Sequence, residues 1–295
     1  MKVNFIYPGQ GSQYIGLGKK LFKKFDYAKK IIKVSNEILE YNIIDSLDKN
    51  PKLINETKYT QPIILIYSLI SDYIVKEAGY IPVSYAGHSL GEYTALVASN
   101  CISLECALKI VKKRSESMDA EGKINPGKMC AMLNLNNSLF NSFKKNINGI
   151  ITVANYNSNK QIIISGDSTT IDSFIIYSKK HKIKTIPLNV SGAFHSPLMK
   201  NVIIKLEKII NSTKFNDVEI PVYQNVKPNK IFSGKKIKSN LKKQVISPVY
   251  WVDTINKMYS NHTNIFLEVG PGNVLSKLNK NINRNINSIN SNLLQ

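Results

Sequence analysis

The chain has 295 residues, 43% of them hydrophobic and 9% aromatic, which is typical of a globular protein and excludes wholesale disorder. Its 40 basic and 20 acidic residues give a formal net charge of +20. Because the lysines are spread along the whole chain beside many asparagines and isoleucines, this charge indicates an AT-biased coding sequence, and we expect no nucleic-acid partner. The N-terminus shows no signal-peptide pattern and no apolar run approaches about 18 residues, so we expect a cytoplasmic protein without a membrane partner.

The cysteines, Cys101, Cys106 and Cys130, are odd in number and show neither C-x-x-C spacing nor a neighbouring histidine cluster. They predict small buried thiols rather than a disulfide or a metal site. The glycine-rich segment 8–13 lacks the lysine of a phosphate-binding loop. We therefore expect neither a metal nor a cofactor.

The chain opens with a predicted strand over 3–7, which ends in the glycine-rich segment 8–13. Helical periodicity then continues to about residue 80. Within this stretch Thr60-Gln61-Pro62 predicts the first turn of an apolar helix over 63–75, a position that suits proline.

A second strand is predicted over 81–85, and the turn 87–91 leads from it into a helix over 92–99. A longer helix follows over 103–121, where Ser103 suits the N-cap and apolar residues recur at helical spacing. Arg114 lies three residues past Val111 on this apolar stripe. We therefore expect the Arg114 side chain to point into the protein.

The pattern changes after residue 127 and predicts a small inserted subdomain over 128–190. Its strands and helices occur in the order βαββαβ, which is the ferredoxin-like unit. The predicted elements are a strand over 129–135, a helix over 137–145, strands over 151–156 and 161–165, a helix over 169–181 and a strand over 184–190.

Residues 191–295 return to the main domain, so the sequence predicts a catalytic core made of 1–127 and 191–295. The elements expected here are a helix over 197–210, a strand near 221–225, a helix that opens at Pro248 and a strand over 264–269. The asparagine-rich segment 279–292 predicts a frayed helix or a disordered tail.

The turn Gly87-His88-Ser89-Leu90-Gly91 matches the G-x-S-x-G nucleophile elbow, and the strand before it and helix after it are the context that this motif needs. Such a turn holds its serine in a strained backbone conformation with the hydroxyl exposed. The sequence therefore predicts Ser89 as a nucleophile for acyl transfer.

A serine nucleophile needs a general base, and the chain offers four histidines. His88 adjoins Ser89 on a sharp turn and should point away from it, whereas His195 lies in a loop before a helix, downstream of the serine. We predict His195 as the base. No acidic residue stands out to orient it, and a main-chain carbonyl can fill that role.

Two N–H groups are needed to stabilise the oxyanion of an acyl-transfer intermediate. The residue after an elbow serine supplies one, which is Leu90. Gln10 is the candidate for the second because Gly9 and Gly11 let its backbone approach closely. The alternative for Gln10 is a plain turn.

Only Arg114 and Arg284 among the 40 basic residues are arginine. In so lysine-rich a chain, a retained arginine on an inward helix face suggests a paired grip on a carboxylate, which lysine cannot provide. An esterase or thioesterase for apolar acyl groups gains nothing from such a cation, and a non-catalytic binding module needs neither Ser89 nor His195.

Taken together, several ordered motifs resemble those of malonyl-CoA:acyl carrier protein transacylases of fatty acid synthesis, and the resemblance spans nearly the whole chain. The motifs are P-G-Q-G-S-Q at 8–13, T-Q-P at 60–62, G-H-S-L-G-E-Y at 87–93, Arg114, A-F-H-S at 193–196, S-P-V-x-W at 247–251 and E-V-G-P-G at 268–272.

This resemblance implies an α/β-hydrolase-like core with a ferredoxin-like subdomain and a serine–histidine dyad. It implies that Arg114 binds the malonyl carboxylate and that Gln61 is a supporting polar residue near the acyl group or, equally, a helix-opening residue. It also implies that the main chain at Tyr250, where relatives often have glutamine or arginine, orients His195. The implied substrates are malonyl-CoA and the phosphopantetheine thiol of acyl carrier protein.

Two finer expectations follow from the same resemblance. Phe194 in A-F-H-S resembles a malonyl-selective signature, and its ring should exclude a methyl branch on the acyl group. Acyl carrier proteins are acidic, so Lys182 and Lys184 on the subdomain are candidates for electrostatic recognition of the carrier.

Overall fold

A computed structural model describes residues 1–19, 21–134 and 137–291. Its larger sheet is parallel except for one edge strand, β8, which pairs antiparallel with β7. The strands of this sheet lie, among the described residues, in the order β10 (Asn287–Asn290), β9 (Ile265–Glu268), β1 (Lys2–Tyr7), β2 (Ile81–Gly87), β7 (Val222–Gln224) and β8 (Lys227–Ile231). Parallel neighbours bring the carboxyl ends of β1, β2 and β7 to one edge, where such sheets place their sites.

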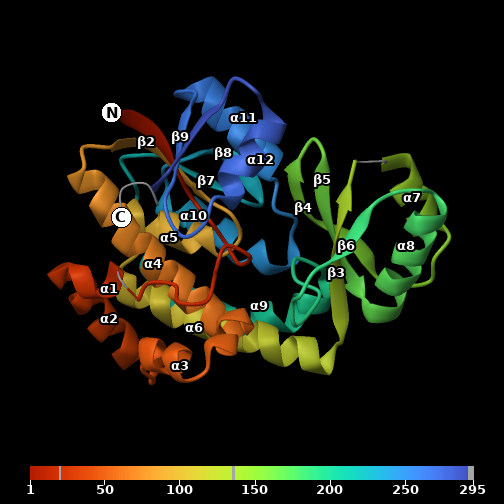
Figure 1. Cartoon of the computed structure of the whole chain (residues 1–295), viewed down its shortest axis with the longest axis horizontal. Helices are drawn as coiled ribbons and strands as arrows, with labels where there is room; N and C mark the ends of the chain where they lie inside the picture. Colours follow the sequence, from red (N-terminus) through yellow and green to blue (C-terminus); the bar gives the residue numbers. More distant parts are fainter. Residues whose placement is uncertain (20, 135–136, 292–295) are drawn as a thin grey trace.

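Helices cover both faces of this sheet because its strands alternate apolar side chains between two cores (Figure 1). Phe5 and Tyr7 of β1 belong to the larger core, whereas Ile6 packs with Trp251 in the smaller one. The helices on the larger-core side include α1 (Leu21–Lys24), α2 (Asp26–Leu39), α3 (Ile43–Lys49), α4 (Thr57–Glu77), α5 (Gly91–Ala98), α6 (Leu104–Ile124), α9 (Lys200–Ser212) and α10 (Gly234–Leu241). Those of the smaller core are α11 (Trp251–Asn261) and α12 (Val274–Ile282).

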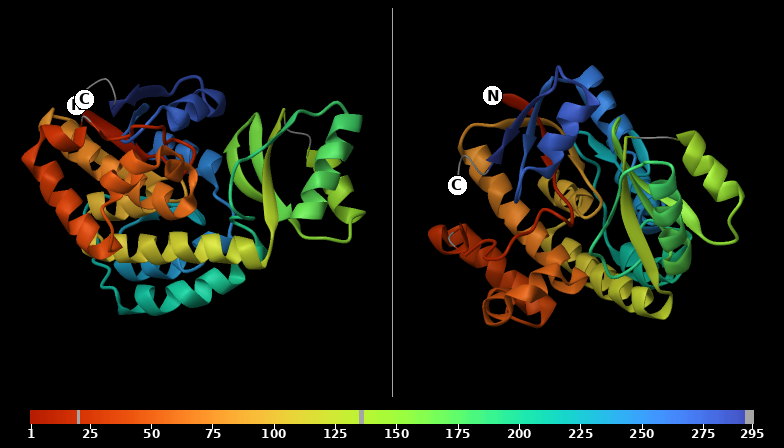
Figure 2. Two further views of the ribbon diagram at one scale, coloured as in Figure 1. Left: turned by 60° about the horizontal axis from the view of Figure 1, so that its bottom comes forward. Right: turned by 45° about the vertical axis from the view of Figure 1, so that its right-hand side comes forward.

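The smaller sheet is antiparallel throughout and projects beside the larger one (Figure 2). Its order is β4 (Ile151–Ser158), β5 (Gln161–Asp167), β3 (Gly127–Leu133) and β6 (Thr185–Pro187), and α7 (Asn137–Lys145) and α8 (Ser168–Lys180) pack on one face. This is the predicted βαββαβ unit in ferredoxin-like order. The predicted fold class, an α/β-hydrolase-like core with a small inserted subdomain, is confirmed. Three short 3₁₀ helices complete the described elements: η1 (Pro51–Asn55), η2 (Pro197–Met199) and η3 (Gln244–Ile246).

Several sequence-based boundaries are wrong. Helix α4 begins at Thr57, so Pro62 lies inside the helix rather than in its first turn, where its ring removes one ladder hydrogen bond. Helix α11 begins at Trp251 rather than at Pro248. The asparagine-rich tail is neither frayed nor disordered over 287–290, because β10 pairs in parallel with β9. Strand β8 and helix α10 lack a sequence-based prediction.

Among the residues that the structure describes, no helix combines the length and apolarity needed to cross a membrane. Likewise, within those residues no group of three or more histidine, cysteine or acidic side chains is placed to hold a metal ion. Cys101 and Cys130 are buried and Cys106 is half-buried, and all three are free thiols.

Candidate active site

Ser89 lies at the carboxyl end of β2, where the chain turns directly into α5. Its φ is 50°, in the left-handed region that non-glycine residues rarely adopt. The turn is this tight because Gly87 and Gly91 touch: a Cβ on Gly87 would lie 1.9 Å from the carbonyl carbon of Gly91. A Cβ on Gly91 would lie 2.1 Å from the carbonyl oxygen of Tyr7 on β1. The two glycines thus allow the elbow to sit against the sheet with the serine hydroxyl at its tip.

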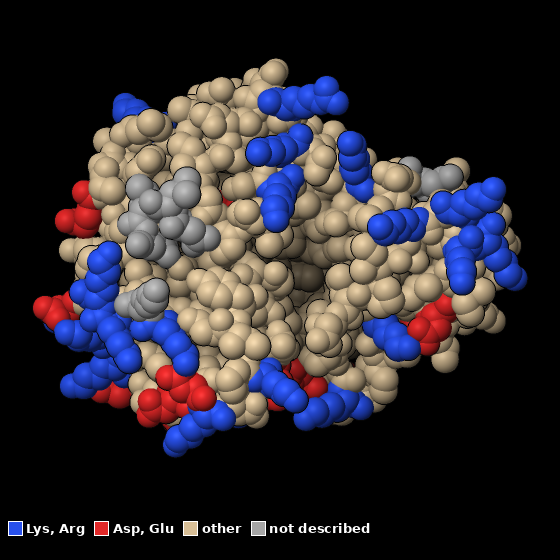
Figure 3. Space-filling model, viewed as in Figure 1, with Lys and Arg blue, Asp and Glu red and all other residues tan. Residues whose placement is uncertain are grey.

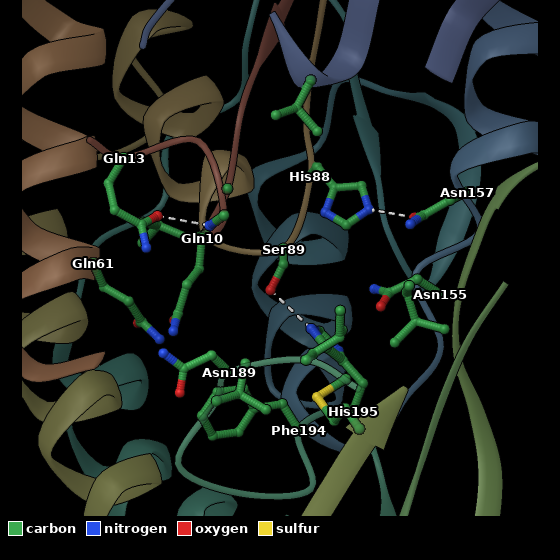
Figure 4. A pocket seen from close by; sticks show the side chains of 18 of the residues that line it. Gln10, Gln13, Gln61, His88, Ser89, Asn155, Asn157, Asn189, Phe194 and His195 are labelled. Atoms are coloured by element: carbon green, nitrogen blue, oxygen red, sulfur yellow. Dashed lines mark hydrogen bonds between the residues drawn. The ribbon is translucent and has the colours of Figure 1, made fainter. Parts of the chain in front are cut away.

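His195 lies across from this hydroxyl, and its Nε2 is 2.7 Å from Ser89 Oγ (Figure 4). The other ring nitrogen, Nδ1, is 3.1 Å from the Gln244 carbonyl oxygen and 3.0 Å from that of Ser247. Because carbonyls only accept hydrogen bonds, Nδ1 carries the proton and Nε2 is left as the acceptor for the serine O–H. This tautomer is the one that a general base for Ser89 requires.

The prediction that the main chain at Tyr250 orients His195 is wrong. The chain turns at η3, which aims the Gln244 and Ser247 carbonyls at Nδ1 before Tyr250 is reached. The Tyr250 N–H instead donates to the Asn225 carbonyl oxygen at 3.1 Å. Its ring stacks on Tyr156 of the small sheet, with centroids 5.4 Å apart.

Arg114 reaches the same point from α6 with its side chain 1% exposed. One Nη donates to Gln61 Oε1 at 2.7 Å, and the other donates to Ser89 Oγ at 3.0 Å and to Gln244 Oε1 at 3.2 Å. Its guanidinium carbon also lies 5.5 Å from the centre of the Tyr93 ring. Within the described residues Arg114 forms no ion pair, and its Nε has no hydrogen-bond partner. A buried cation without a paired carboxylate is costly, which makes this a receptive place for an anion.

The environment of His195 favours its neutral form. Burial and, after it, the nearby Arg114 charge lower the pKa of His195 to about 3, against the raising effect of the two carbonyls. Burial also lowers the pKa of Arg114, while Tyr93 and Glu92 oppose that shift. Neutral His195 beside a neutral serine hydroxyl is the resting state of a base and nucleophile awaiting substrate.

The loop that carries Gln10 packs directly on the elbow. A Cβ on Gly9 would lie 2.4 Å from the His88 carbonyl oxygen, so only glycine allows this approach. The Gln10 side chain donates to Thr57 Oγ1 at 3.2 Å. Leu90 is the N-cap of α5, where N–H groups are not used by the helix ladder. Both residues line the cavity around Ser89, and their role as oxyanion donors stays a prediction.

Two more of the predicted residues line this cavity, whose volume is about 380 Å³ and which opens between the two sheets (Figure 3). Gln61 is 1% exposed and holds Arg114, and Phe194 is 6% exposed beside His195 (Figure 4). Lys182 and Lys184 follow α8, are exposed and do not line the cavity.

Sequence reasoning missed amide side chains that contact the site or line its cavity, among them Gln244, Asn155 and Asn157. The Gln244 side chain accepts from Arg114 through Oε1 at 3.2 Å and donates from Nε2 to the Ser89 carbonyl oxygen at 3.0 Å, while its main-chain carbonyl oxygen accepts from His195 Nδ1. Asn157 and Asn155 enter the cavity from β4, and Asn157 Oδ1 lies 2.8 Å from Nε2 of His88, whose ring is thereby directed away from the serine hydroxyl. In so asparagine-rich a chain no compositional signal marks these residues.

This fold and site define a serine acyltransferase: a hydroxyl at a strained elbow, a histidine base and a buried cation at the edge of a parallel sheet. The family model for the acyl transferase domain matches residues 4–292. A malonyl CoA-acyl carrier protein transacylase of Bacillus subtilis is 35% identical over 98% of this chain and 92% of its own length. One from Staphylococcus aureus is 36% identical over 97% of this chain and 94% of its own length.

Solved structures agree with the sequence comparison. The malonyl-CoA:ACP transacylase of Synechocystis superposes with a TM-score of 0.91 at 30% identity, covering 98% of this chain and 97% of that one. The transacylase of Clostridium perfringens gives a TM-score of 0.91 at 33% identity, covering 98% and 93%. The chain belongs to the malonyl CoA-acyl carrier protein transacylase family.

Proposed function

We propose that this chain transfers a malonyl group from malonyl-CoA to the phosphopantetheine thiol of acyl carrier protein, through a malonyl-Ser89 intermediate, for fatty acid synthesis. The observation that carries the substrate assignment is the buried Arg114 guanidinium, which lies 3.0 Å from Ser89 Oγ and has no ion pair among the described residues. A carboxylate attached to the acyl group would supply that missing partner.

In the first half-reaction His195 Nε2 takes the proton of Ser89 Oγ, and the oxygen attacks the thioester carbonyl carbon. The Leu90 and Gln10 N–H groups stabilise the resulting oxyanion. The carbon–sulfur bond then breaks, and His195 returns its proton to the leaving thiolate of coenzyme A. The Gln244 and Ser247 carbonyls stabilise the transient imidazolium through Nδ1–H.

The second half-reaction runs the same steps with a new thiol. His195 takes the proton of the carrier's thiol, the thiolate attacks the malonyl ester, and Ser89 leaves with the proton. Both acyl donor and acceptor are substrates, and the chemistry of these residues needs no metal and no cofactor. An acidic carrier, the absence of nucleic-acid and membrane partners and a cytoplasmic location belong to the same proposal and rest on the sequence features given above.

Mass spectrometry after brief incubation with malonyl-CoA tests the proposal. We expect a malonyl adduct on the peptide that contains Ser89, and loss of that adduct when apo acyl carrier protein is replaced by its phosphopantetheine form. A hydrolase for apolar acyl groups would instead acquire no malonyl label and would release free acid from acetyl-CoA or longer thioesters. Labelling at a residue other than Ser89 would overturn the assignment of the nucleophile.

A further inference from the structure

Asn225 follows the last residue of β7 and is 0% exposed, directly behind the nucleophile elbow. Its Oδ1 accepts the Ser89 N–H at 2.7 Å, and its Nδ2 donates to the Gly87 carbonyl oxygen at 2.6 Å. A main-chain N–H only donates and a carbonyl only accepts, so the two contacts fix which way the amide faces. One side chain therefore clamps the elbow on both sides of His88, at the point where Ser89 holds its left-handed φ of 50°.

Asn225 is itself anchored by a buried carboxylate. Its main-chain N–H donates to Glu92 Oε2 at 2.8 Å, and the preceding residue, Gln224, donates from Nε2 to Glu92 Oε1 at 3.0 Å. Glu92 is 0% exposed and lies in the first turn of α5, immediately after the elbow. Burial raises the pKa of Glu92, whereas the bonds from Asn225 and Gln224 and the Arg114 charge act in the opposite direction. The N-terminus of α5 also favours a negative charge at this position. The carboxylate, the asparagine and the elbow thus form one closed loop of contacts.

The same asparagine also reaches the histidine side of the site. Its carbonyl oxygen accepts the Tyr250 N–H at 3.1 Å. Tyr250 lies three residues after Ser247, whose carbonyl oxygen accepts a hydrogen bond from His195 Nδ1. Asn225 therefore contacts the segment that carries the nucleophile through its side chain and the segment that orients the base through its main chain.

We propose that Asn225, held by Glu92, is a positioning residue that sets the alignment of Ser89 Oγ with His195 Nε2. The inference rests on the proposed function only for the choice of substrate, because a serine–histidine pair of any specificity needs this alignment. One consequence is chemical: the Ser89 N–H is already occupied by Asn225 and is unavailable to an oxyanion, which leaves that role to other N–H groups at the elbow.

The decisive variant is Asn225→Asp, which keeps the volume and the acceptor for the Ser89 N–H. It places an oxygen against the Gly87 carbonyl, so the elbow must shift. Single-turnover acylation by malonyl-CoA should slow about 100-fold, the effect of a misplacement near 1 Å. The KM for malonyl-CoA should stay within about threefold, because Arg114 is untouched. Glu92→Gln should cause a smaller, roughly tenfold loss, as expected for one hydrogen bond.

Asn146→Asp is the matched control, since exposed Asn146 makes the same kind of bond, from Nδ2 to the Ser142 carbonyl at 2.9 Å. It should leave the acylation rate unchanged. Melting temperature and circular dichroism measure the folded fraction of each variant. Unchanged acylation in folded Asn225→Asp would overturn the proposal, and so would loss of the fold in both Asn225→Asp and Glu92→Gln, because the pair would then serve stability alone.

A fluorophosphonate probe separates this inference from the proposed function, because its reaction needs the serine–histidine geometry but no malonyl group. If the wild-type chain reacts with the probe and not with malonyl-CoA, the proposed substrate is wrong, and the probe rates of the variants still measure alignment. If malonyl-CoA labels the wild-type chain and Asn225→Asp reacts with the probe at the wild-type rate, the positioning role is wrong and the proposed function stands.

Discussion

The wall of the cavity built on the large sheet carries Ser89, His88 and Arg114, whereas the wall built on the small sheet offers Asn155, Asn157 and aliphatic side chains. His195 comes from the segment that joins the two parts. Among the described lining residues, the small sheet contributes no charged group.

The large-sheet wall thus holds the reacting groups, whereas the small-sheet wall provides room for the rest of the substrate. Reacting groups must be held within a fraction of an ångström, and the large-sheet wall does this with packed strand ends and hydrogen-bonded side chains. A neutral wall of amides suits a long uncharged arm, because amides bond to it without demanding a counter-charge. Substitutions on the large-sheet wall should therefore change the rate of acyl transfer. Substitutions elsewhere should change the choice of acyl group or the recognition of the carrier.

The largest effect is expected from the dyad. Ser89→Ala should abolish acyl-enzyme formation, since no other hydroxyl shares the elbow, and His195→Ala should slow it about 10⁴- to 10⁶-fold. Mass spectrometry of the malonyl adduct measures the first variant and rapid-quench kinetics the second. Normal labelling of Ser89→Ala would place the nucleophile elsewhere. It would also contradict the conclusion that the large-sheet wall carries the reacting groups.

Arg114→Ala should cost about 2 to 5 kcal/mol in kcat/KM for malonyl-CoA, because it removes a buried charge-assisted pair. Transfer of acetyl groups should be retained or gained, since acetyl carries no carboxylate. Arg114→Lys should restore malonyl transfer only in part, because lysine lacks the planar fork. Comparison of both thioesters in all three proteins is the measurement, and equal losses with malonyl and acetyl would make Arg114 a structural residue.

The pH dependence of the reaction should show the effect of the Arg114 charge on His195. Because burial and Arg114 lower the pKa of His195 to about 3, the base stays deprotonated in acid, and the acid limb of kcat/KM should lie well below pH 6.5. Arg114→Gln removes the cation, so the pKa of His195 should rise and the limb should move to higher pH. Profiles for the two proteins with acetyl-CoA test this, and a limb that stays in place would show that the cation does not act on His195.

Phe194 lies beside His195, and its substitution tests which residue selects the acyl group. A buried ring beside His195 should exclude the α-methyl branch of methylmalonyl-CoA, since overfilling a packed site costs about 1 to 3 kcal/mol. Phe194→Ser should narrow the ratio of kcat/KM for malonyl over methylmalonyl about tenfold. An unchanged ratio would mean that another residue sets the selection.

The smallest effect is expected outside the cavity. Because the chain carries a net charge of +20, transfer to an acidic carrier should weaken with salt more steeply than acylation by malonyl-CoA. Lys182→Ala with Lys184→Ala should reduce that extra slope, and Lys144→Ala with Lys145→Ala on α7 is a control of equal charge. If the rates of the two half-reactions of the wild-type chain depend equally on salt, electrostatic recognition of the carrier is wrong.

What the sequence predicts well is what neighbouring residues determine. The elbow, the Ser103 cap of α6, where Ser103 Oγ accepts the Cys106 N–H at 3.2 Å, and the βαββαβ order all follow from short patterns. The carbonyls that orient His195 do not, because Gln244 and Ser247 lie about 50 residues away and any residue has a carbonyl.

The tail shows the same limit. Asparagine-rich residues 287–290 carry no strand pattern, and their pairing comes from the free edge of β9 rather than from their own propensity. Pro62 illustrates the reverse case, in which a strong local signal for a helix start is overridden by buried packing along α4, from Thr57 onward.

Both members of the dyad, Ser89 with φ of 50° and His195 with φ of 56°, hold a backbone conformation that side chains resist. Glycine would adopt either conformation freely but could not carry out the chemistry. Selection for stability alone would therefore drive both positions away from activity. In a library of variants of this chain selected only for heat resistance, inactivating substitutions should accumulate first at these two positions. The residues found there therefore show whether a population is under selection for function.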